Sequence, residues 1–271
     1  MNEFELIRDY FDHRDGLRDD VLLGIGDDAA LLQVPPSMAL AASIDTLVEG
    51  VHFDHHSSPD ALGRKAAAVN LSDLAAVGAE PAWAMLSLTL PDADPEWLRA
   101  FSDGLFDMLS RYNVQLIGGD SSRGPLAITL QVQGFVPQGQ ALRRDGARPG
   151  DRVYLSGPVG LASLALWCRR HRTDLPQAEG RLLMQALDQP VPRIETGIKL
   201  RGVASSAIDI SDGLLADLGH ICTASRVGAV IDTTALPRST VFSACARSLL
   251  QQGLISDEIL LSMQLTGGIF G

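Results

Sequence analysis

The sequence has few cysteines and no long apolar run. Its three cysteines, Cys168, Cys222 and Cys245, lie far apart and form no CxxC pair, which argues against a disulfide framework and a zinc knuckle. No run is long and apolar enough to cross a bilayer, and the acidic start MNEFELIRDYF lacks the basic region of a signal peptide. We therefore expect a cytoplasmic protein with no membrane partner.

Positive charge is also scarce. The 271 residues carry 22 Lys and Arg against 33 Asp and Glu, a formal net charge of −11. Binding to a nucleic-acid backbone needs clustered basic side chains that displace counterions. The balance argues against a nucleic-acid partner and suits a protein that gathers divalent cations.

The usual phosphate-binding motifs are missing. The sequence contains no GxxxxGK[ST], and its only lysines, Lys65 and Lys199, lack the glycine-rich context of a P-loop. The motif set of protein kinases is absent as well. If this protein transfers a phosphoryl group, the phosphates must therefore be bound by metal ions, by the backbone of glycine residues and by arginine side chains.

The first half of the chain alternates strand-like and helical patterns, which predicts an α/β (α+β) fold. One helix is predicted to start after Ser58, with Pro59 as its first residue, and another after Asp94, with Pro95 in that role. A short helix is predicted over 3–12, and strands over 21–26, 38–45, 82–90, 114–118 and 126–136.

Glycine and proline become dense near residue 145, and a new pattern starts there. We place a domain boundary at 145–150, which gives an N-terminal domain, 1–146, and a C-terminal α/β domain, 147–271. In the second domain the pattern predicts helices at 159–170, 178–188, 193–201, 212–225 and about 239–252, and strands at 152–156, 206–210 and 228–232.

Aspartates end several of the apolar segments. The run LLGIGDDAALL stops at Asp27 and Asp28, and the same pattern recurs at Asp45, Asp73, Asp120 and the pair Asp209 and Asp212. Each one alone could cap a helix or close a turn. Their recurrence suggests a shared site. If all of these except Asp27 converge, the six carboxylates would need several cations. Oxygen donors suit magnesium, and carboxylate-bound magnesium usually accompanies phosphate, with a nucleoside triphosphate as the obvious ligand.

Other residues fit a phosphate site beside these aspartates. Gly118 and Gly119 would let a phosphate approach the backbone, and Arg144 could neutralise its charge. His52, seven residues after Asp45, is close enough to reach the other end of a substrate. A transition-metal site made of His52 with His55 and His56 is disfavoured, because their spacing matches no known ligand pattern.

Five segments carry a resemblance to a known family. In order and spacing, GIGDDAA, DTLVEGVHF, NLSDLAAVGAEP, IGGDSSRG and DISDGLLADL resemble the thiamine-monophosphate kinases, over about residues 3–268. That family belongs to the superfamily of aminoimidazole ribonucleotide synthetase, selenophosphate synthetase and a hydrogenase maturation factor. The selenophosphate branch is less similar. Its members carry a reactive cysteine or selenocysteine near the N-terminus, whereas the first cysteine of this sequence is Cys168.

The resemblance implies transfer of the γ-phosphate of ATP to thiamine monophosphate by direct in-line attack, giving thiamine diphosphate. It implies a homodimer whose N-terminal mixed sheets pair into a barrel. It also implies that Gly119, Asp120, Arg144 and Ser211 contact ATP and that His52 contacts thiamine monophosphate. Magnesium ligands would be Asp28, Ser43, Ile44 through its backbone, Asp45, Asp73, Asp120, Asp209 and Asp212, with Asp28, Asp45, Asp73, Asp120 and Asp212 carrying catalysis.

One departure from the family pattern lies at the C-terminal end. Family members continue after LTGG with an acidic substrate contact and later an aromatic residue, whereas here Ile269, Phe270 and Gly271 follow. We therefore expect a shortened second domain. The part of the active site that binds ATP and magnesium should be intact, whereas binding of thiamine monophosphate should be impaired. Three alternatives stay open: a related enzyme that activates an amide or carbonyl oxygen, a non-catalytic nucleotide or magnesium sensor, and a metal-dependent phosphatase.

Overall fold

The computed structural model describes residues 3–12 and 18–266, and the chain divides into two units. Unit 1 holds the residues up to Ala141 together with Val191–Arg201, and unit 2 holds Leu142–Pro190 and the residues from Gly202 onward. The chain therefore passes from unit 1 into unit 2 after Ala141, and Val191–Arg201 returns to unit 1. Within the described ranges, no helix is long and apolar enough to cross a membrane.

A four-stranded mixed sheet organises unit 1. Its strands are β3 (Met38–Val48), β6 (Ala127–Pro137), β4 (Glu80–Leu90) and β5 (Gln115–Arg123), in that spatial order. Strand β6 is antiparallel to both β3 and β4, whereas β4 and β5 are parallel and are joined by a helical crossover. Strands β3 and β5 therefore form the two opposite edges of the sheet.

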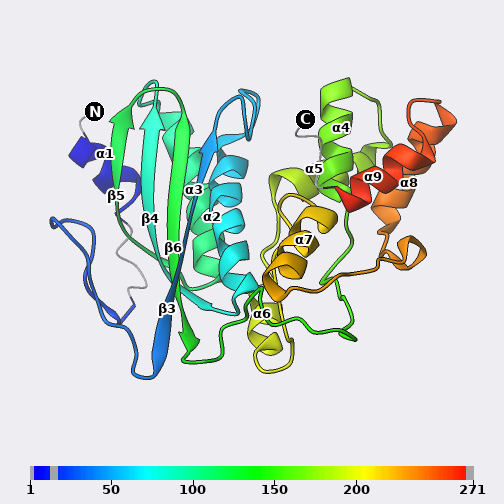
Figure 1. Cartoon of the computed structure of the whole chain (residues 1–271). Coiled ribbons are helices and arrows are strands. Elements are labelled where there is room, and N and C mark those ends of the chain that lie inside the picture. Colours follow the sequence, from blue (N-terminus) through cyan, green and yellow to red (C-terminus); the bar gives the residue numbers. More distant parts are fainter. Residues whose placement is uncertain (1–2, 13–17, 267–271) are drawn as a thin grey trace. The chain divides into compact units, whose positions relative to one another are not determined.

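Two helices cover one face of this sheet, α2 (Pro59–Ala76) and α3 (Pro95–Arg111), as Figure 1 shows. Small residues of helix α2 are completely buried: Ala66, Ala67 and Ala68 are each at most 1% exposed. Because consecutive helical residues point in different directions, they pack against different neighbours. The two helices also approach each other closely, because a side chain at Gly63 would overlap the Phe101 carbonyl oxygen and one at Gly104 would overlap that of Asp60. The apolar core of unit 1 fills the space between these helices and the sheet.

Smaller elements complete unit 1. On the other face of the sheet, β1 (Val21–Leu23) pairs with β2 (Leu31–Leu32), and residues of this hairpin pack on Trp83 and Phe135. The indole of Trp83 donates a hydrogen bond to Asp20 at 2.9 Å. Helix α1 (Glu3–Tyr10) contributes to the main core, and α6 (Ile194–Leu200) packs on α2.

Unit 2 is helical in the part of the chain that the structure describes. Leu164, Leu183, Cys245 and Leu249 are fully buried at its centre. Its helices are α4 (Leu161–His171), α5 (Gln177–Asp188), α7 (Leu214–Ser225), α8 (Thr240–Gln251) and α9 (Asp257–Leu265), with a 3₁₀ turn, η1, at Thr233–Ala235.

The predicted helices and the strands of unit 1 are confirmed, with ends shifted by a few residues. Helix α3 begins as predicted, since the Asp94 side chain accepts the Glu96 N–H at 3.0 Å. Ser58 stands at the N-cap of α2, but its side chain makes no capping bond. Helix α9 was not predicted, although Ser256 caps it by accepting the N–H of Ile259.

The strands predicted at 152–156, 206–210 and 228–232 are wrong, since all three segments lack strand structure. A strand exists only with a hydrogen-bonded neighbour. The Ala207 N–H donates to the Arg143 carbonyl at 3.1 Å, but no ladder continues from this bond among the described residues. The mixed α/β character therefore comes from the sheet of unit 1, and the strands of the described residues form no closed barrel.

The close contact of α2 with α3 predicts a large effect for a small substitution. Gly104→Ala should lower the free energy of unfolding by about 3 kcal/mol, because the added methyl meets a backbone carbonyl that cannot rotate away. Gly219→Ala, in open space within α7, should instead stabilise the protein by about 0.5 to 1 kcal/mol. Urea unfolding followed by circular dichroism measures both, and equal effects would contradict the helix contact.

Candidate functional site

The candidate site in unit 1 is built on edge strand β3 and helix α2. Ser43 and Asp45 are two residues apart on β3 and therefore point to the same face of the sheet, the face that α2 covers. Asp73 lies in the last turn of α2 and accepts a hydrogen bond from the Ser43 hydroxyl. Strand and helix thus bring a hydroxyl and two carboxylates together.

The environment of Asp45 disfavours its charge. Burial raises the pKa of this carboxyl, and the nearby negative charge of Asp73 raises it further. His52 opposes these effects and lowers the pKa, but it is the weakest of the three. The carboxylates of Asp45 and Asp73 therefore lie close enough to repel each other, and a cation between them would relieve the repulsion.

His52 lies just after β3 and is held by the backbone. Its Nδ1 atom accepts the N–H of Val48 at 3.0 Å. In the neutral ring the proton is then on Nε2, which is left as a donor. The side chain is exposed and close enough to Asp45 to influence its pKa. An exposed N–H donor near the Asp45 carboxylate suits an anionic group that is also held by a cation.

Two other predicted residues of unit 1 are exposed. Asp28 lies in the turn between β1 and β2, where its N–H donates to the Asp27 carboxylate at 2.8 Å. Ile44 follows Ser43 on β3, and its side chain points away from α2. A magnesium contact of Ile44 would therefore use its carbonyl oxygen, as the resemblance implies.

Gly119 and Asp120 lie on the opposite edge of the sheet, in β5. The register aligns Asp45 with Leu130, Leu130 with Leu86, and Leu86 with Gly119. Three strand spacings of about 4.8 Å separate the two edges, so Asp120 lies about 14 Å from Asp45 within one protomer. The structure does not bring these two carboxylates together in a single chain.

The structure gives Gly119 a packing role. A side chain at this position would overlap the carbonyl oxygen of Leu86 in the neighbouring strand. The absence of a side chain is therefore required by the sheet itself, whatever ligand approaches. Asp120 is exposed, and its carboxylate accepts a hydrogen bond from the Ser122 hydroxyl at 3.0 Å.

Unit 2 carries the remaining predicted residues. Asp209 is half-buried, whereas the side chains of Ser211 and Asp212 are exposed in the turn that precedes α7. Arg144 is also exposed, and its carbonyl oxygen accepts a hydrogen bond from the Ser225 hydroxyl at 2.7 Å. These residues place carboxylate, hydroxyl and guanidinium groups at the surface of unit 2.

Sequence reasoning missed Asp217. This carboxylate is 3% exposed and accepts the backbone N–H groups of Ser211, Asp212 and Gly213. In the sequence it looks like an ordinary polar residue of a helix. The available signal was its position, one helical turn after Gly213, where a carboxylate can reach back to unpaired N–H groups.

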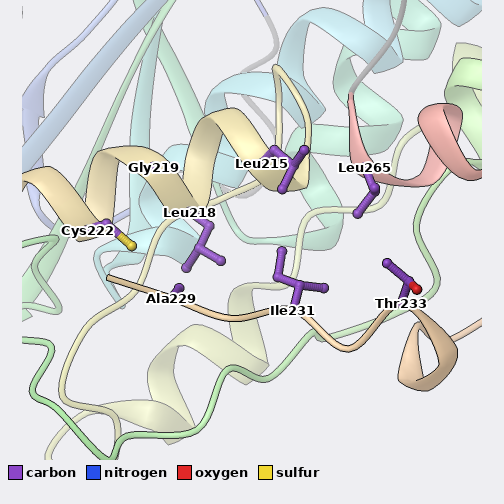
Figure 2. Close-up of a pocket in the computed structure, with 8 residues that line it drawn as sticks. All are labelled: Leu215, Leu218, Gly219, Cys222, Ala229, Ile231, Thr233 and Leu265. Carbon is purple, nitrogen blue, oxygen red and sulfur yellow. The ribbon is translucent and has the colours of Figure 1, made fainter. Parts of the chain in front are cut away.

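A cavity of about 400 Å³ lies beside α7 in unit 2 (Figure 2). Helix α7 supplies one wall, residues 229–233 another, and α9 contributes Leu265. No charged side chain lines it, so it lacks the groups that a triphosphate and its cations require. The lining residues are Leu215, Leu218, Gly219, Cys222, Ala229, Ile231, Thr233 and Leu265.

The donor set in unit 1 fits a hard cation. Ser43, Asp45 and Asp73 offer only oxygen atoms, which magnesium prefers. Within the described residues, no three His, Cys, Asp or Glu side chains come together as a ready metal site. The cluster is therefore a partial site, and a phosphate ligand, water or further protein oxygen would have to complete its coordination.

The chain matches two family models. Residues 26–136 match the family described as AIR synthase related protein, N-terminal domain, and residues 148–263 match AIR synthase related protein, C-terminal domain. The family's two-domain division therefore extends over most of the sequence.

Comparison with individual proteins narrows the family further than the two family models do. The thiamine-monophosphate kinase of Escherichia coli (strain K12) is 53% identical over 242 residues, which are 89% of this chain and 74% of that protein. A crystal structure of thiamine-monophosphate kinase from Stenotrophomonas maltophilia K279a is 44% identical, with a TM-score of 0.84 over 93% of this chain and 78% of that one. A structure of AaThiL complexed with AMPPCP and TMP is 30% identical, with a TM-score of 0.79 over 98% and 81%.

The raised pKa of Asp45 predicts how acidity changes the stability of the metal-free protein. A raised pKa means that folding favours the neutral carboxyl, so this contribution is present below the unfolded pKa of about 4 and is lost as pH rises through the folded pKa. Asp45→Asn should therefore stabilise the protein at pH 7 in the presence of a chelator. The gain should stay below about 1 kcal/mol, because solvent screens this partly exposed group.

Thermal unfolding of the wild type and Asp45→Asn across the acid and neutral range measures this effect. The two melting curves should converge in acid and separate towards neutral pH. Asp103→Asn, at an exposed position of α3, serves as the control and should follow the wild type. Destabilisation by Asp45→Asn at neutral pH would show that protein donors satisfy the Asp45 carboxylate.

Proposed function

Because the chain belongs to the thiamine-monophosphate kinases, within the AIR synthase related family, we propose that it phosphorylates thiamine monophosphate by direct, magnesium-assisted in-line transfer. ATP is the co-substrate, and thiamine diphosphate and ADP are the products. The bond between the β–γ bridging oxygen and the γ-phosphorus breaks, while a phosphate oxygen of thiamine monophosphate bonds to that phosphorus. We propose the cytoplasm, where ATP is made, as the location of this reaction.

One observation carries the proposed mechanism: the oxygen cluster of Ser43, Asp45 and Asp73 beside His52. Its crowded carboxylates suit magnesium, and the nearby ring donor suits the phosphate of the acceptor. When bound, magnesium neutralises charge on the phosphates and on the group being transferred. The attacking atom is already a phosphate oxygen, so the chain needs no strong base. Its residues have to align two anions that repel each other.

The roles of individual residues follow from this arrangement. Asp45 and Asp73 would hold magnesium with Ser43, and His52 would donate from Nε2 to the thiamine phosphate. The further proposed magnesium ligands are Asp28, the Ile44 carbonyl, Asp120, Asp209 and Asp212. The proposed ATP contacts are Gly119, Asp120, Arg144 and Ser211.

We further propose that the working form is a homodimer that closes the sheet into a barrel. What supports this is the position of the predicted ligands on opposite edge strands, β3 and β5. Pairing β3 of one protomer with β5 of its partner would satisfy both edges and give an eight-stranded barrel. Leu40 and Ile44 of β3 and Met85 of β4 are exposed on the face that α2 and α3 leave open, where a partner sheet would cover them.

The activity is tested by incubating the chain with ATP, magnesium and thiamine monophosphate and quantifying the products by chromatography. Thiamine diphosphate and ADP should form in equal amounts. Asp45→Asn should lower kcat by about a hundredfold, because it removes a ligand that acts on the transferring group, while Asp103→Asn should behave as the wild type.

Each of the other product patterns contradicts the proposal in a different way. Inorganic phosphate formed with or without thiamine monophosphate would indicate a phosphatase. ADP formed with another acceptor would indicate a related enzyme that activates an amide or carbonyl oxygen. Binding of ATP without any product would indicate a sensor.

The barrel dimer predicts complementation between two nearly inactive variants. Asp45→Asn and Asp120→Asn should each keep only about a hundredth of the wild-type activity when alone. After mixing and subunit exchange, half of the dimers should be mixed, and each mixed dimer should have one site with both carboxylates intact. About a quarter of the wild-type activity should therefore return. No recovery, despite exchange verified by native mass spectrometry, would show that the two carboxylates do not share a site across the interface.

A further inference from the structure

A single buried carboxylate holds the turn that carries Ser211 and Asp212. The Oδ2 atom of Asp217 accepts the N–H of Ser211 at 3.0 Å, of Asp212 at 3.1 Å and of Gly213 at 3.0 Å. Asp217 lies in the first turn of α7, and its own N–H donates to the Gly213 carbonyl at 2.9 Å. Three consecutive N–H groups thus converge on one oxygen atom.

The backbone conformation at Gly213 permits this arrangement. Gly213 stands at the N-cap of α7 with φ of 116° and ψ of 156°, a combination almost restricted to glycine. It has no side chain with which to cap the helix. Asp217 performs the capping from inside the helix and draws the preceding turn over its own carboxylate.

These bonds determine which groups the turn offers to a ligand. Successive backbone N–H groups before a helix usually form a binding site for an external anion. Here the anion is the carboxylate of Asp217, which is 3% exposed, and the three N–H groups are already used. The exposed atoms of the turn include the hydroxyl of Ser211 and the carboxylate of Asp212, which are oxygen donors suited to a cation.

We propose that Asp217 is a positioning residue for the magnesium and ATP contacts of this turn. It fixes the turn so that Asp212 and Ser211 present their oxygen atoms outward, and it prevents the N–H groups of this turn from binding the triphosphate directly. The inference rests on the proposed function, since that function assigns Asp212 to magnesium and Ser211 to ATP. It adds that nucleotide is held at this turn through a cation.

Substitution of Asp217 tests the proposal. Asp217→Ala should raise the magnesium concentration for half-maximal activity and the KM for ATP by about tenfold or more, as loss of a residue that orients a metal ligand typically does. The KM for thiamine monophosphate should stay unchanged. Asp217→Asn retains an acceptor oxygen without the charge, so its defect should be smaller and excess magnesium should restore its kcat.

A matched control separates positioning from stability. Asp232 accepts the Thr234 N–H at 2.9 Å and caps the 3₁₀ turn of the same unit. Asp232→Ala should lower the melting temperature, because it removes this cap, but it should leave the magnesium dependence of the activity unchanged. If Asp217→Ala does not fold, Asp217→Asn decides the question. A folded Asp217 variant with the magnesium dependence and both KM values of the wild type would overturn the inference.

Calorimetry with magnesium and a non-hydrolysable ATP analogue gives a readout that does not depend on turnover. Asp217→Ala should bind the analogue about tenfold more weakly in magnesium than the wild type does, and Asp217→Asn should show a smaller loss. If the wild type forms no thiamine diphosphate, the proposed function fails, yet the binding comparison still tests Asp217. If the wild type is active and the variants bind as it does, only the role of Asp217 fails.

Discussion

The candidate site depends on how closely helix α2 approaches the sheet. Asp73 reaches Ser43 only because α2 lies deep against β3 and β6. The middle of α2 is buried on several sides through the small residues Ala66, Ala67 and Ala68, which let the neighbouring elements approach the helix closely. Larger side chains would lift α2 and separate the carboxylate of Asp73 from the oxygen atoms of β3. The geometry of the cluster is therefore set by packing along the whole length of the helix.

Much of unit 1 could be predicted because its signals are local. The Asp94 and Pro95 pair marks the start of α3 directly, and alternating apolar residues mark β6, whose ladder with β3 and β4 then forms. In unit 2 the apolar segment at 228–232 has the composition of a strand but no hydrogen-bonded ladder. Strand identity there depends on a partner, which no local pattern specifies.

The candidate site was partly predictable for the same reason. Asp45 and Asp73 each end or interrupt an apolar segment, and the structure brings these two side chains near each other. The position of Asp120 on the opposite edge follows from the strand order, which is a property of the whole sheet. Asp217 was missed because its role depends on three backbone N–H groups and on the conformation of Gly213.

The contact between Gly63 and Gly104 also restricts how this sequence can diverge. A side chain at either glycine would meet a main-chain carbonyl of the opposite helix, that of Phe101 or of Asp60. Every amino acid has the same main chain, so no change of residue at Phe101 or Asp60 could make room. In most packed cores, a larger side chain at one position can be compensated by a smaller one at its neighbour. At this helix contact such compensation is impossible. Homologues that keep the close approach of α2 and α3 should keep both glycines even where the surrounding core has been replaced.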